Sequence, residues 1–439
     1  MEIDFYTYQD KVKGCWTGKN IGGTFGAPFE GKRQINNAEF YVQDLTEAPS
    51  NDDLDLQIVW LSAAERYGKF LNASILGEYW LSYILPNWVE YGTAKANLRA
   101  GLAPPLSGVV DNVYRNSCGC FIRSEIWACL APGHPEISTK YAYEDAIVDH
   151  AEEGMLAEIF CAALQSAAFA ESDPKRLIEI ALSYIPQQSA VAKAVKTAQK
   201  CYMDGVSIPE ARIQIHNSAP GTFGLQAIDP KNMQTGDNAK MDLGTPGFDA
   251  PENVAFVIAG WLYGEGDFGK SLIIANSFGE DTDCTCATLG ALMGILQGDQ
   301  NIPELWKAPL DDRISTSCID KTSLGIWIPK NTGELTEKVI RTMPLFLGAD
   351  FCGISSNLKI CCASSLLCEK ANTFLSGVAI QKKNEERPPI NELFSLSPYI
   401  TIHRFPFMTV LVDYDGSVYY QKDERRKMRI RVYNALYLN

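Results

Sequence analysis

The segment EEGMLAEIFCAALQSAAFA, residues 152–170, decides the fold class. Its apolar residues recur at spacings of three and four, the period of an α-helix that buries one face. The same spacing recurs in residues 63–85, 174–185 and 253–263, with Gly or Pro at the joins between such segments. Convincing alternating strands are missing as far as about Leu345. The sequence therefore predicts a mainly α protein, an all-helical bundle, and disfavours a doubly wound nucleotide-binding fold.

The rest of the chain has a different pattern, with short runs rich in β-branched and aromatic residues. These runs are residues 357–365, 399–405, 407–421 and 428–438. Asp415–Gly416 lies between two apolar runs, which is typical of a β-hairpin turn. We therefore divide the chain into an all-α domain, residues 1–345, and a small β-rich C-terminal module, residues 346–439. The final run has no evident closing partner, so the module is either incomplete or completes its sheet against the helical body or another subunit.

Composition and charge restrict the function classes. Of 439 residues, 46% are hydrophobic and 21% charged, as in an ordinary soluble globular protein. The chain has 39 Lys and Arg against 53 Asp and Glu, a formal net charge of -14. Because this charge repels phosphate backbones and anionic lipids, we expect no long nucleic acid and no membrane as partner. A small phosphorylated ligand stays compatible, because backbone amides, an arginine or a divalent cation can supply a local positive field.

The cysteines and the N-terminus favour a cytoplasmic protein. Thirteen cysteines, an odd number, are scattered along the chain, and those in apolar helical surroundings, such as Cys161, behave as small hydrophobic residues. Cys118/Cys120 and Cys284/Cys286 are C-x-C pairs, but neither has a second pair at zinc-finger spacing or a nearby histidine, so a zinc site is disfavoured. The N-terminus lacks the apolar region of a signal peptide, and no apolar run reaches membrane-spanning length.

Two acidic segments carry the candidate chemistry. Asn51, Asp52 and Asp53 directly precede an amphipathic helix, and adjacent carboxylates repel each other unless a cation neutralises them. Taken alone, this cluster is better explained as an ordinary helix N-cap. Asp281 and Asp283, however, stand at the head of a second helix with hydroxyl groups beside them, and such hard oxygen ligands suit magnesium or manganese. Two oxygen clusters, each at a helix entrance, are what a two-metal carboxylate site in a helical bundle requires.

A third segment, residues 13–33, is rich in glycine. Gly18, Gly22, Gly23 and Gly26 permit tight helix contact and close approach of the backbone to a ligand. The segment is not a phosphate-binding loop of the G-K-[ST] type, and no strand precedes it as a dinucleotide-binding fingerprint would require.

These segments, with two others between them, closely resemble the ADP-ribosylglycohydrolase family. The matching stretches are GAPFEG with Glu30, NDDLDLQ with Asn51, Asp52 and Asp53, NSCGCFIRSE with Gly119 and Arg123, VDHAEEGMLAEIF with His150 and Gly154, and GEDTDCT with Asp281 and Asp283. The resemblance covers about residues 8 to 305. Five segments in the family's order are far more specific than any one motif.

The resemblance implies an all-α orthogonal bundle that holds two magnesium ions, with manganese as the other candidate. It implies metal ligands at Asn51, Asp52, Asp53, Asp281, Asp283 and Thr285. The metals would bind ribose hydroxyls and hold a water against the anomeric carbon. It further implies catalytic roles for Glu30, Asp52, Asp53 and Asp283, Glu30 giving acid/base help, and an ADP-ribose site lined by Gly119, Arg123, His150 and Gly154.

The sequence also departs from the family pattern. The last threonine of the first metal motif is Leu54, which ligates nothing, and Asp55 is an extra carboxylate that could replace it. The position after Asp283 is Cys284, a softer and poorer magnesium ligand, so Thr285 is the expected substitute. Arg123 and His150 each have a structural reading as well, Arg123 as an ion pair with Glu125 or Glu144.

Three functional hypotheses follow. The first is a metal-dependent hydrolase of an N- or O-glycosidic bond to ADP-ribose or a related riboside. The leaving group is left open among arginine, serine, a nucleobase and a small metabolite, and so is the oligomeric state. The second is a catalytically silent metal- or nucleotide-binding protein, which Leu54 and Cys284 favour. The third gives the working role to the β-rich module, as a docking surface for a carbohydrate or a partner protein.

Overall fold

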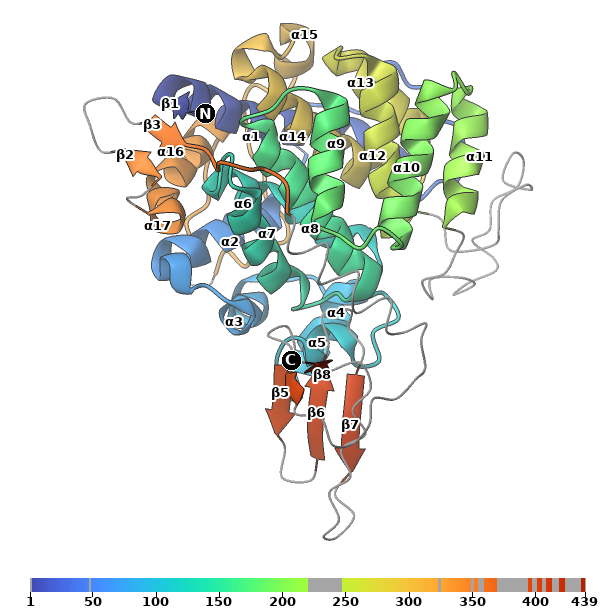
Figure 1. Cartoon of the computed structure of the whole chain (residues 1–439). Coiled ribbons are helices and arrows are strands. Elements are labelled where there is room, and N and C mark those ends of the chain that lie inside the picture. Colours follow the sequence, from blue (N-terminus) through green and yellow to red (C-terminus); the bar gives the residue numbers. More distant parts are fainter. Residues whose placement is uncertain are drawn as a thin grey trace.

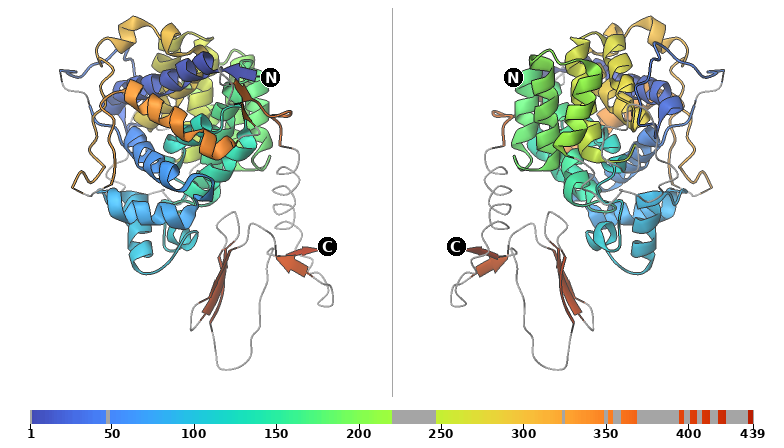
Figure 2. Two further views of the ribbon diagram at one scale, coloured as in Figure 1. Left: turned by 90° about the vertical axis from the view of Figure 1, so that its left-hand side faces the viewer. Right: turned by 90° about the vertical axis from the view of Figure 1, so that its right-hand side faces the viewer.

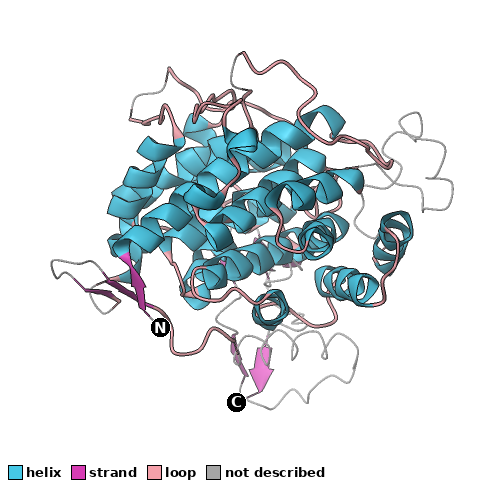
Figure 3. Ribbon diagram, turned by 90° about the horizontal axis from the view of Figure 1, so that it is seen from above, coloured by secondary structure: helices cyan, strands magenta, loops and turns pink. Residues whose placement is uncertain are grey.

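The structure of this chain is a computed structural model that describes residues 2–46, 49–219, 247–322, 325–348, 351–353, 359–368 and five short strands after residue 393. The predicted all-helical body is confirmed, with helices packed side by side from Phe5 to Leu347 (Figures 1 and 3). The helices are α1 (Phe5–Gly26), α2 (Asp52–Tyr67), α3 (Ala73–Tyr83), α4 (Val89–Arg99), α5 (Leu106–Val109), α6 (Glu125–Leu130), α7 (Pro135–Ala146), α8 (Glu152–Ala168), α9 (Pro174–Ser183), α10 (Ala190–Met203), α11 (Ile208–Ser218), α12 (Ala250–Gly264), α13 (Phe268–Ser277), α14 (Thr282–Gln297), α15 (Glu304–Lys307), α16 (Thr332–Thr342) and α17 (Pro344–Leu347).

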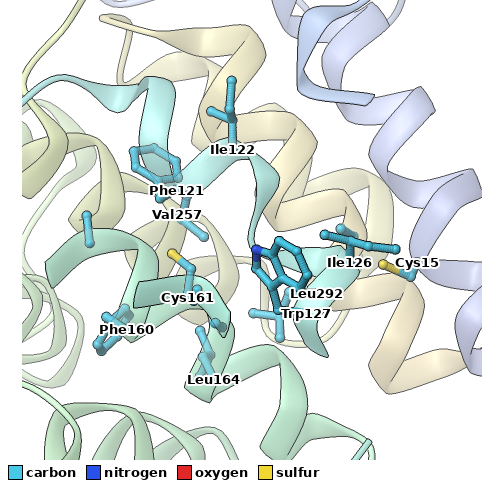
Figure 4. Packing of buried hydrophobic residues seen from close by; sticks show 14 of the residues in the cluster. Cys15, Phe121, Ile122, Ile126, Trp127, Phe160, Cys161, Leu164, Val257 and Leu292 are labelled. Carbon is cyan, nitrogen blue, oxygen red and sulfur yellow. The ribbon is translucent and has the colours of Figure 1, made fainter. Parts of the chain in front are cut away.

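The segment that decides the fold class forms α8, which contacts α6, α7, α9, α12 and α14. Every residue from Gly154 to Ala168 is buried, so α8 packs against neighbours on all sides. Figure 4 shows Phe160 and Leu164 of this helix in a cluster with Val257 of α12. Burying each such side chain contributes roughly 1.5–3 kcal/mol, so this cluster is a main source of the body's stability.

The glycine-rich segment forms α1, which packs unusually closely against α14. A Cβ at Gly18 would overlap the carbonyl oxygen of Gly290, and one at Gly22 would overlap that of Cys286. The backbones of the two helices therefore touch, and at the end of the contact the Thr282 hydroxyl donates to the carbonyl oxygen of Gly26 at 2.9 Å. This packing brings the C-terminal end of α1 to the head of α14, where the second acidic motif lies.

The α1–α14 contact makes a direct prediction. Gly18→Ala is expected to lower the free energy of unfolding by about 2–3 kcal/mol, because the new methyl group meets rigid backbone and forces the helices apart. Gly333→Ala on α16 is the control, since its Cβ would meet only the ends of the Asn331 and Asp312 side chains, and it should change stability by less than about 1 kcal/mol. Urea unfolding followed by circular dichroism measures both; equal stabilities for the two variants would contradict the close backbone contact.

A small sheet joins the start of the chain to residues beyond the helices. Its order is β1 (Glu2–Asp4), β3 (Lys359–Cys361) and β2 (Cys352–Gly353), all antiparallel, with Ile3 opposite Ile360. The next residues also contact the helices, because Ala363 donates its N–H to the carbonyl oxygen of Gly133 at 3.0 Å. Cys352, Gly353 and residues 359–363, which we assigned to the C-terminal module, thus pack on the helical body, and the boundary at residue 345 stays a prediction.

The remaining strands form two further antiparallel sheets. One has β5 (Thr401–Arg404), β6 (Met408–Val412) and β7 (Val418–Lys422) in sequence order, and the other pairs β4 (Phe394–Leu396) with β8 (Leu436–Leu438). In Figures 1 and 2, β5, β6 and β7 lie outside the helical body. The predicted Asp415–Gly416 turn is outside the described residues, although β6 and β7 on either side pair as a hairpin would. The final run does have a partner, since Leu436 pairs with Leu396.

In the part of the chain that the structure describes, no helix combines the length and the apolar character needed to cross a membrane.

Candidate metal centre

Three carboxyl groups meet at the head of α14. Asp281 caps this helix, Asp283 is in its first turn, and Glu30 follows the short 3₁₀ helix η1 (Ala27–Phe29) at the end of α1. One oxygen from each of Glu30, Asp281 and Asp283 lies within 4.8 Å of the others. The predicted pairing of Glu30 with the second acidic motif is therefore present in the fold.

Residues 31–33 and Glu280 hold Glu30 near the head of α14. Glu280 accepts a hydrogen bond from Arg33 Nε at 2.8 Å, and its backbone N–H donates to the carbonyl oxygen of Lys32 at 2.9 Å. Glu280 is fully buried and has φ of 63°, a left-handed conformation that is unfavourable for a glutamate. This pairing could not be predicted from the sequence, because Arg33 and Glu280 are 247 positions apart.

A second group of ligand atoms comes from α2 and α14. Asn51 caps α2, and its Oδ1 accepts the backbone N–H of Asp53 at 2.8 Å. This cap turns Asp53 into the interior, where its carboxylate, that of Asp283 and the Sγ of Cys284 lie within 4.8 Å of one another. Asp283 therefore belongs to both groups.

The buried carboxylates of these groups are incompletely hydrogen-bonded. Asp53 Oδ2, Asp281 Oδ1 and Asp283 Oδ1 are buried and accept no hydrogen bond from the residues that the structure describes. Burial raises the pKa of Asp53 and of Asp281 well above the ordinary value, and burial together with Glu30 raises the pKa of Asp283 to about 7. Glu30 reaches solvent, yet desolvation by its surroundings, with the charges of Asp52 and Asp53, raises its pKa to about 6. Oxygens that repel one another and lack donors fit a divalent cation.

Two residues that sequence reasoning missed hold the α2 carboxylates in place. Lys19 of α1 is fully buried, and its Nζ lies 3.2 Å from both Asp53 Oδ1 and Glu125 Oε1. Burial would lower the pKa of Lys19, but Glu125 and Asp53 outweigh it and raise the pKa. Tyr91 of α4 donates its hydroxyl to Asp52 Oδ2 at 3.0 Å. Lys19 thus orients Asp53 and Tyr91 orients Asp52, both predicted metal ligands, and neither contact involves Asp283.

Three residues at the two motifs have partners in the protein itself. The Thr285 hydroxyl donates to the carbonyl oxygen of Thr282 at 3.3 Å, and its role as a metal ligand stays a prediction; the Sγ of Cys284 is the atom after Asp283 that lies beside the carboxylates. Asp55 accepts the backbone N–H groups of Ser317 and Cys318, both at 2.7 Å, and so fixes a loop instead of extending the metal motif. The Asn51 side chain caps α2 through its Oδ1, and its role as a metal ligand stays a prediction.

Arg123 lies in a separate buried ion network. It ends the 3₁₀ helix η3 (Cys118–Arg123) and is fully buried. Its Nε donates to Asp145 Oδ1 at 2.8 Å, and one terminal nitrogen donates to Asp149 Oδ2 at 3.1 Å. The partners are thus Asp145 and Asp149, not Glu125 or Glu144. Arg123 also donates to the carbonyl oxygen of Gly119 at 2.6 Å, so it braces the turn that carries Gly119.

Gly119, His150 and Gly154 gather beside Glu90 of α4, which sequence reasoning also missed. A Cβ at Gly119 would overlap Glu90 Oε1, and one at Gly154 would crowd the ring of His150. His150 is fully buried, with Nε2 2.9 Å from the Ser117 hydroxyl. Glu90 adjoins Tyr91, the partner of Asp52. The structure therefore brings three of the predicted substrate-binding residues together beside Glu90. The next residue of α4, Tyr91, contacts the acidic cluster through Asp52.

The buried Glu90 should make the stability of the protein depend on pH. Burial raises the pKa of Glu90 to about 7. His150 and Ser117 oppose this rise, and Asp149 adds to it. A folded-state pKa above that of the unfolded chain stabilises the protonated protein, and this contribution is present below about pH 4.5 and lost as the pH rises towards 7. Glu90→Gln cannot ionise, so at pH 8 its free energy of unfolding should exceed that of the wild type by up to about 3 kcal/mol.

Urea unfolding at pH 5 and pH 8 tests this expectation. The variant should gain on the wild type only at the higher pH. The exposed Glu39→Gln serves as control and should stay within about 0.5 kcal/mol of the wild type at both values. A Glu90→Gln protein with an unchanged pH dependence would show that Glu90 ionises freely in the fold.

The fold and these contacts define a class. This class consists of helical proteins in which acidic side chains from the ends of three helices meet in one cluster suited to divalent cations. The chain belongs to the ADP-ribosylglycohydrolase family, whose model matches residues 5–338. Membership makes it a hydrolase of the glycosidase type that acts on ADP-ribosyl compounds, and the family is in general metal-dependent.

Comparison with known proteins adds little detail. Among solved structures that match is one titled "ADP-ribosylglycohydrolase-related protein complex", at 17% sequence identity and a TM-score of 0.46, with 78% of this chain and 99% of that chain covered. No curated protein matches the chain.

Proposed function

We propose that this protein hydrolyses the N- or O-glycosidic bond that joins ADP-ribose, or a related riboside, to its leaving group, with two divalent cations in the acidic cluster. The observation that carries the proposal is that Asp283 belongs to two ligand groups, one with Glu30 and Asp281 and one with Asp53 and Cys284. Asp283 is thus shared by the two groups, and each group has a buried carboxylate oxygen, on Asp53 and on Asp281, that no described residue hydrogen-bonds. This arrangement is expected of a binuclear centre.

In this proposal some residues are metal ligands and one also acts as a general base. Glu30, Asp53, Asp281 and Asp283 would hold the cations, for which magnesium or manganese suits the all-oxygen group. Bound cations would orient the ribose hydroxyls and make a water acidic enough to act as nucleophile. Glu30 is the one of these carboxylates that is exposed to solvent, so it is the one placed to accept a proton from water.

The ribosyl group must lie beside the cluster for this chemistry to occur. We place it between the acidic cluster and the wall made by Gly119, His150 and Gly154. The two glycines let Glu90 and His150 pack closely against the backbone and so shape this wall. Asp52, oriented by Tyr91, faces the positive charge that develops on the sugar as the glycosidic bond breaks. Arg123 acts at a distance, by bracing the turn with Gly119.

The test is a substrate panel with the full-length chain. Arginine-linked, serine-linked and nucleobase-linked ADP-ribose are each incubated with magnesium, with manganese and with EDTA, and free ADP-ribose is measured by chromatography. We expect cation-dependent release from at least one substrate. Tight binding of ADP-ribose without turnover on any of them would favour the alternative, a catalytically silent binding protein, which the buried Leu54 in the first motif makes the leading competitor.

A further inference from the structure

One ligand group of the proposed centre contains sulfur. The Sγ of Cys284 lies within 4.8 Å of a carboxylate oxygen of both Asp53 and Asp283. The other cysteine of this C-x-C pair is oriented differently, because Cys286 Sγ donates to the carbonyl oxygen of Leu272 at 3.7 Å. The helix thus presents one thiol to the acidic cluster and buries the next one elsewhere.

The oxygens beside this thiol are ready to bind a ligand. Asp53 is fully buried and Asp283 is 8% exposed. Within the described part of the chain, one oxygen of each, Asp53 Oδ2 and Asp283 Oδ1, accepts no hydrogen bond. Lys19 engages only the other oxygen of Asp53, at 3.2 Å. Two donor-free carboxylate oxygens in a protein interior are costly unless a cation pairs with them. These orphaned oxygens are an observation independent of the thiol.

We propose that Asp53, Asp283 and Cys284 form a thiolate-containing half of the centre that selects a thiophilic divalent cation such as zinc over magnesium. The all-oxygen half, with Glu30, Asp281 and the shared Asp283, keeps the preference for magnesium or manganese. The reason is ligand softness, since thiolate sulfur favours zinc, whereas magnesium requires oxygen ligands. The inference rests on the proposed two-cation centre and specifies the identity of one of its cations.

Binding through sulfur also fixes the proton balance. The metal–sulfur bond forms as the S–H bond of Cys284 breaks, and the proton is released to the solvent. No electron is transferred, so the step needs no oxidant. Zinc binding should therefore release a proton that substitution of Cys284 would retain.

Cobalt(II) is the probe, because a cobalt–thiolate bond gives a near-ultraviolet charge-transfer band that oxygen ligands do not. Full-length protein, freed of metal by a chelator and kept reduced, is titrated with cobalt chloride and then with zinc in competition with magnesium. We expect the band to appear with the wild type and to vanish in Cys284→Thr, which offers oxygen instead. The same substitution removes a direct ligand, so it should lower zinc affinity by at least the roughly 10- to 100-fold that losing an outer-shell partner of a metal ligand causes.

Controls separate this inference from the proposed function. Cys286→Ala, which removes the neighbouring thiol outside the cluster, should keep the band. If Cys284→Thr does not fold, Cys284→Ser takes its place, and the zinc-to-magnesium ratio of the wild type, measured by mass spectrometry after dialysis against equal concentrations, gives an independent reading. Cobalt binding without the band, or equal retention of zinc and magnesium, overturns the thiolate half and leaves the two-cation proposal standing. Failure of every divalent cation to bind overturns both.

Discussion

Asp283→Asn is expected to lower kcat/KM for ADP-ribosyl substrates by at least about 10²-fold, the lower range of what positioned electrostatic and general-base groups contribute. Asp283 is the carboxylate common to the groups around Glu30 and around Asp53, so its loss disturbs both. Asparagine has nearly the same shape but carries no charge. Calorimetric titration with magnesium or manganese should show a matching loss of cation affinity.

The same substitution should have the opposite effect on the stability of the metal-free protein. Burial and the neighbouring Glu30 raise the pKa of Asp283 to about 7, which means that its charge is unfavourable when no cation is present. In EDTA at pH 8, Asp283→Asn should therefore unfold at a free energy about 1–2 kcal/mol higher than the wild type, a gain of stability at the expense of activity. Added cation should stabilise the wild type and not the variant.

Asp299→Asn is the matched control. Asp299 is a similarly buried aspartate, but Thr17 donates to it at 2.7 Å and Lys13 pairs with it at 3.1 Å, so its charge is already compensated. Its substitution should lower stability and leave cation affinity intact. Parallel losses of stability in Asp283→Asn and Asp299→Asn, with cation binding kept in both, would show that the cluster around Asp283 is only structural.

Much of this centre could be predicted from the sequence because its parts are local. Asp53 and Asp283 stand at helix entrances, where capping residues and the following apolar period are both visible in one short segment. The glycines of α1 indicated tight helix packing, and the contact of Gly18 with Gly290 is that packing. Fold class and acidic motifs are thus features that a few neighbouring residues encode.

The parts that could not be predicted depend on contacts between distant segments. Lys19 lies 34 residues from Asp53 and 106 from Glu125, and nothing near Lys19 in the sequence indicates that it is buried between two acids. A lysine in a glycine-rich helix is normally a solvent-exposed residue. Its burial is tolerated only because both carboxylates and a backbone carbonyl pair with it.

The choice between Cys284 and Thr285 was, in contrast, open to sequence reasoning. Successive residues of an α-helix point about 100° apart, so a residue two positions after Asp283 points roughly 200° away from it. Cys284 stays on the side of the cluster, whereas the Thr285 hydroxyl turns back to its own helix and bonds Thr282. Helical phase favours Cys284, whose Sγ lies beside Asp53 and Asp283, while Thr285 as a ligand stays a prediction.

Arg123→Met is expected to destabilise the protein by about 3–5 kcal/mol, the usual effect of leaving buried charges unpaired. The guanidinium is fully buried between Asp145 and Asp149, donates to the carbonyl oxygen of Gly119, and lies over the ring of Trp80 at 5.4 Å. Methionine fills a similar volume without the charge. Arg123→Lys should also destabilise, although less, because an ammonium group cannot reproduce the planar fork that bonds both aspartates.

The pH dependence of this loss has a definite sign. Burial would raise the pKa of Asp149, but Arg123 and His150 outweigh it and hold this pKa below its ordinary value. A lowered folded-state pKa contributes stability above the pKa of the unfolded chain and loses it as the pH falls through the folded value. In the wild type that loss falls below the ordinary carboxylate pKa. In Arg123→Met the guanidinium is gone and burial raises the pKa of Asp149, so the difference in stability between wild type and variant should be larger at pH 8 than at pH 4.

The role of Arg123 is decided by combining stability with kinetics. If the network is structural, the triple variant Arg123→Met/Asp145→Asn/Asp149→Asn should recover a large part of the lost stability, because no buried charge is left unpaired. Arg123→Lys, assayed below its unfolding temperature, should then keep a near wild-type KM for ADP-ribosyl substrates. A normally stable Arg123→Lys protein with a strongly raised KM would instead show that the guanidinium binds the substrate directly. The full burial of Arg123 and its engagement by two aspartates favour the first result, in which this residue acts on the substrate only through the turn that carries Gly119.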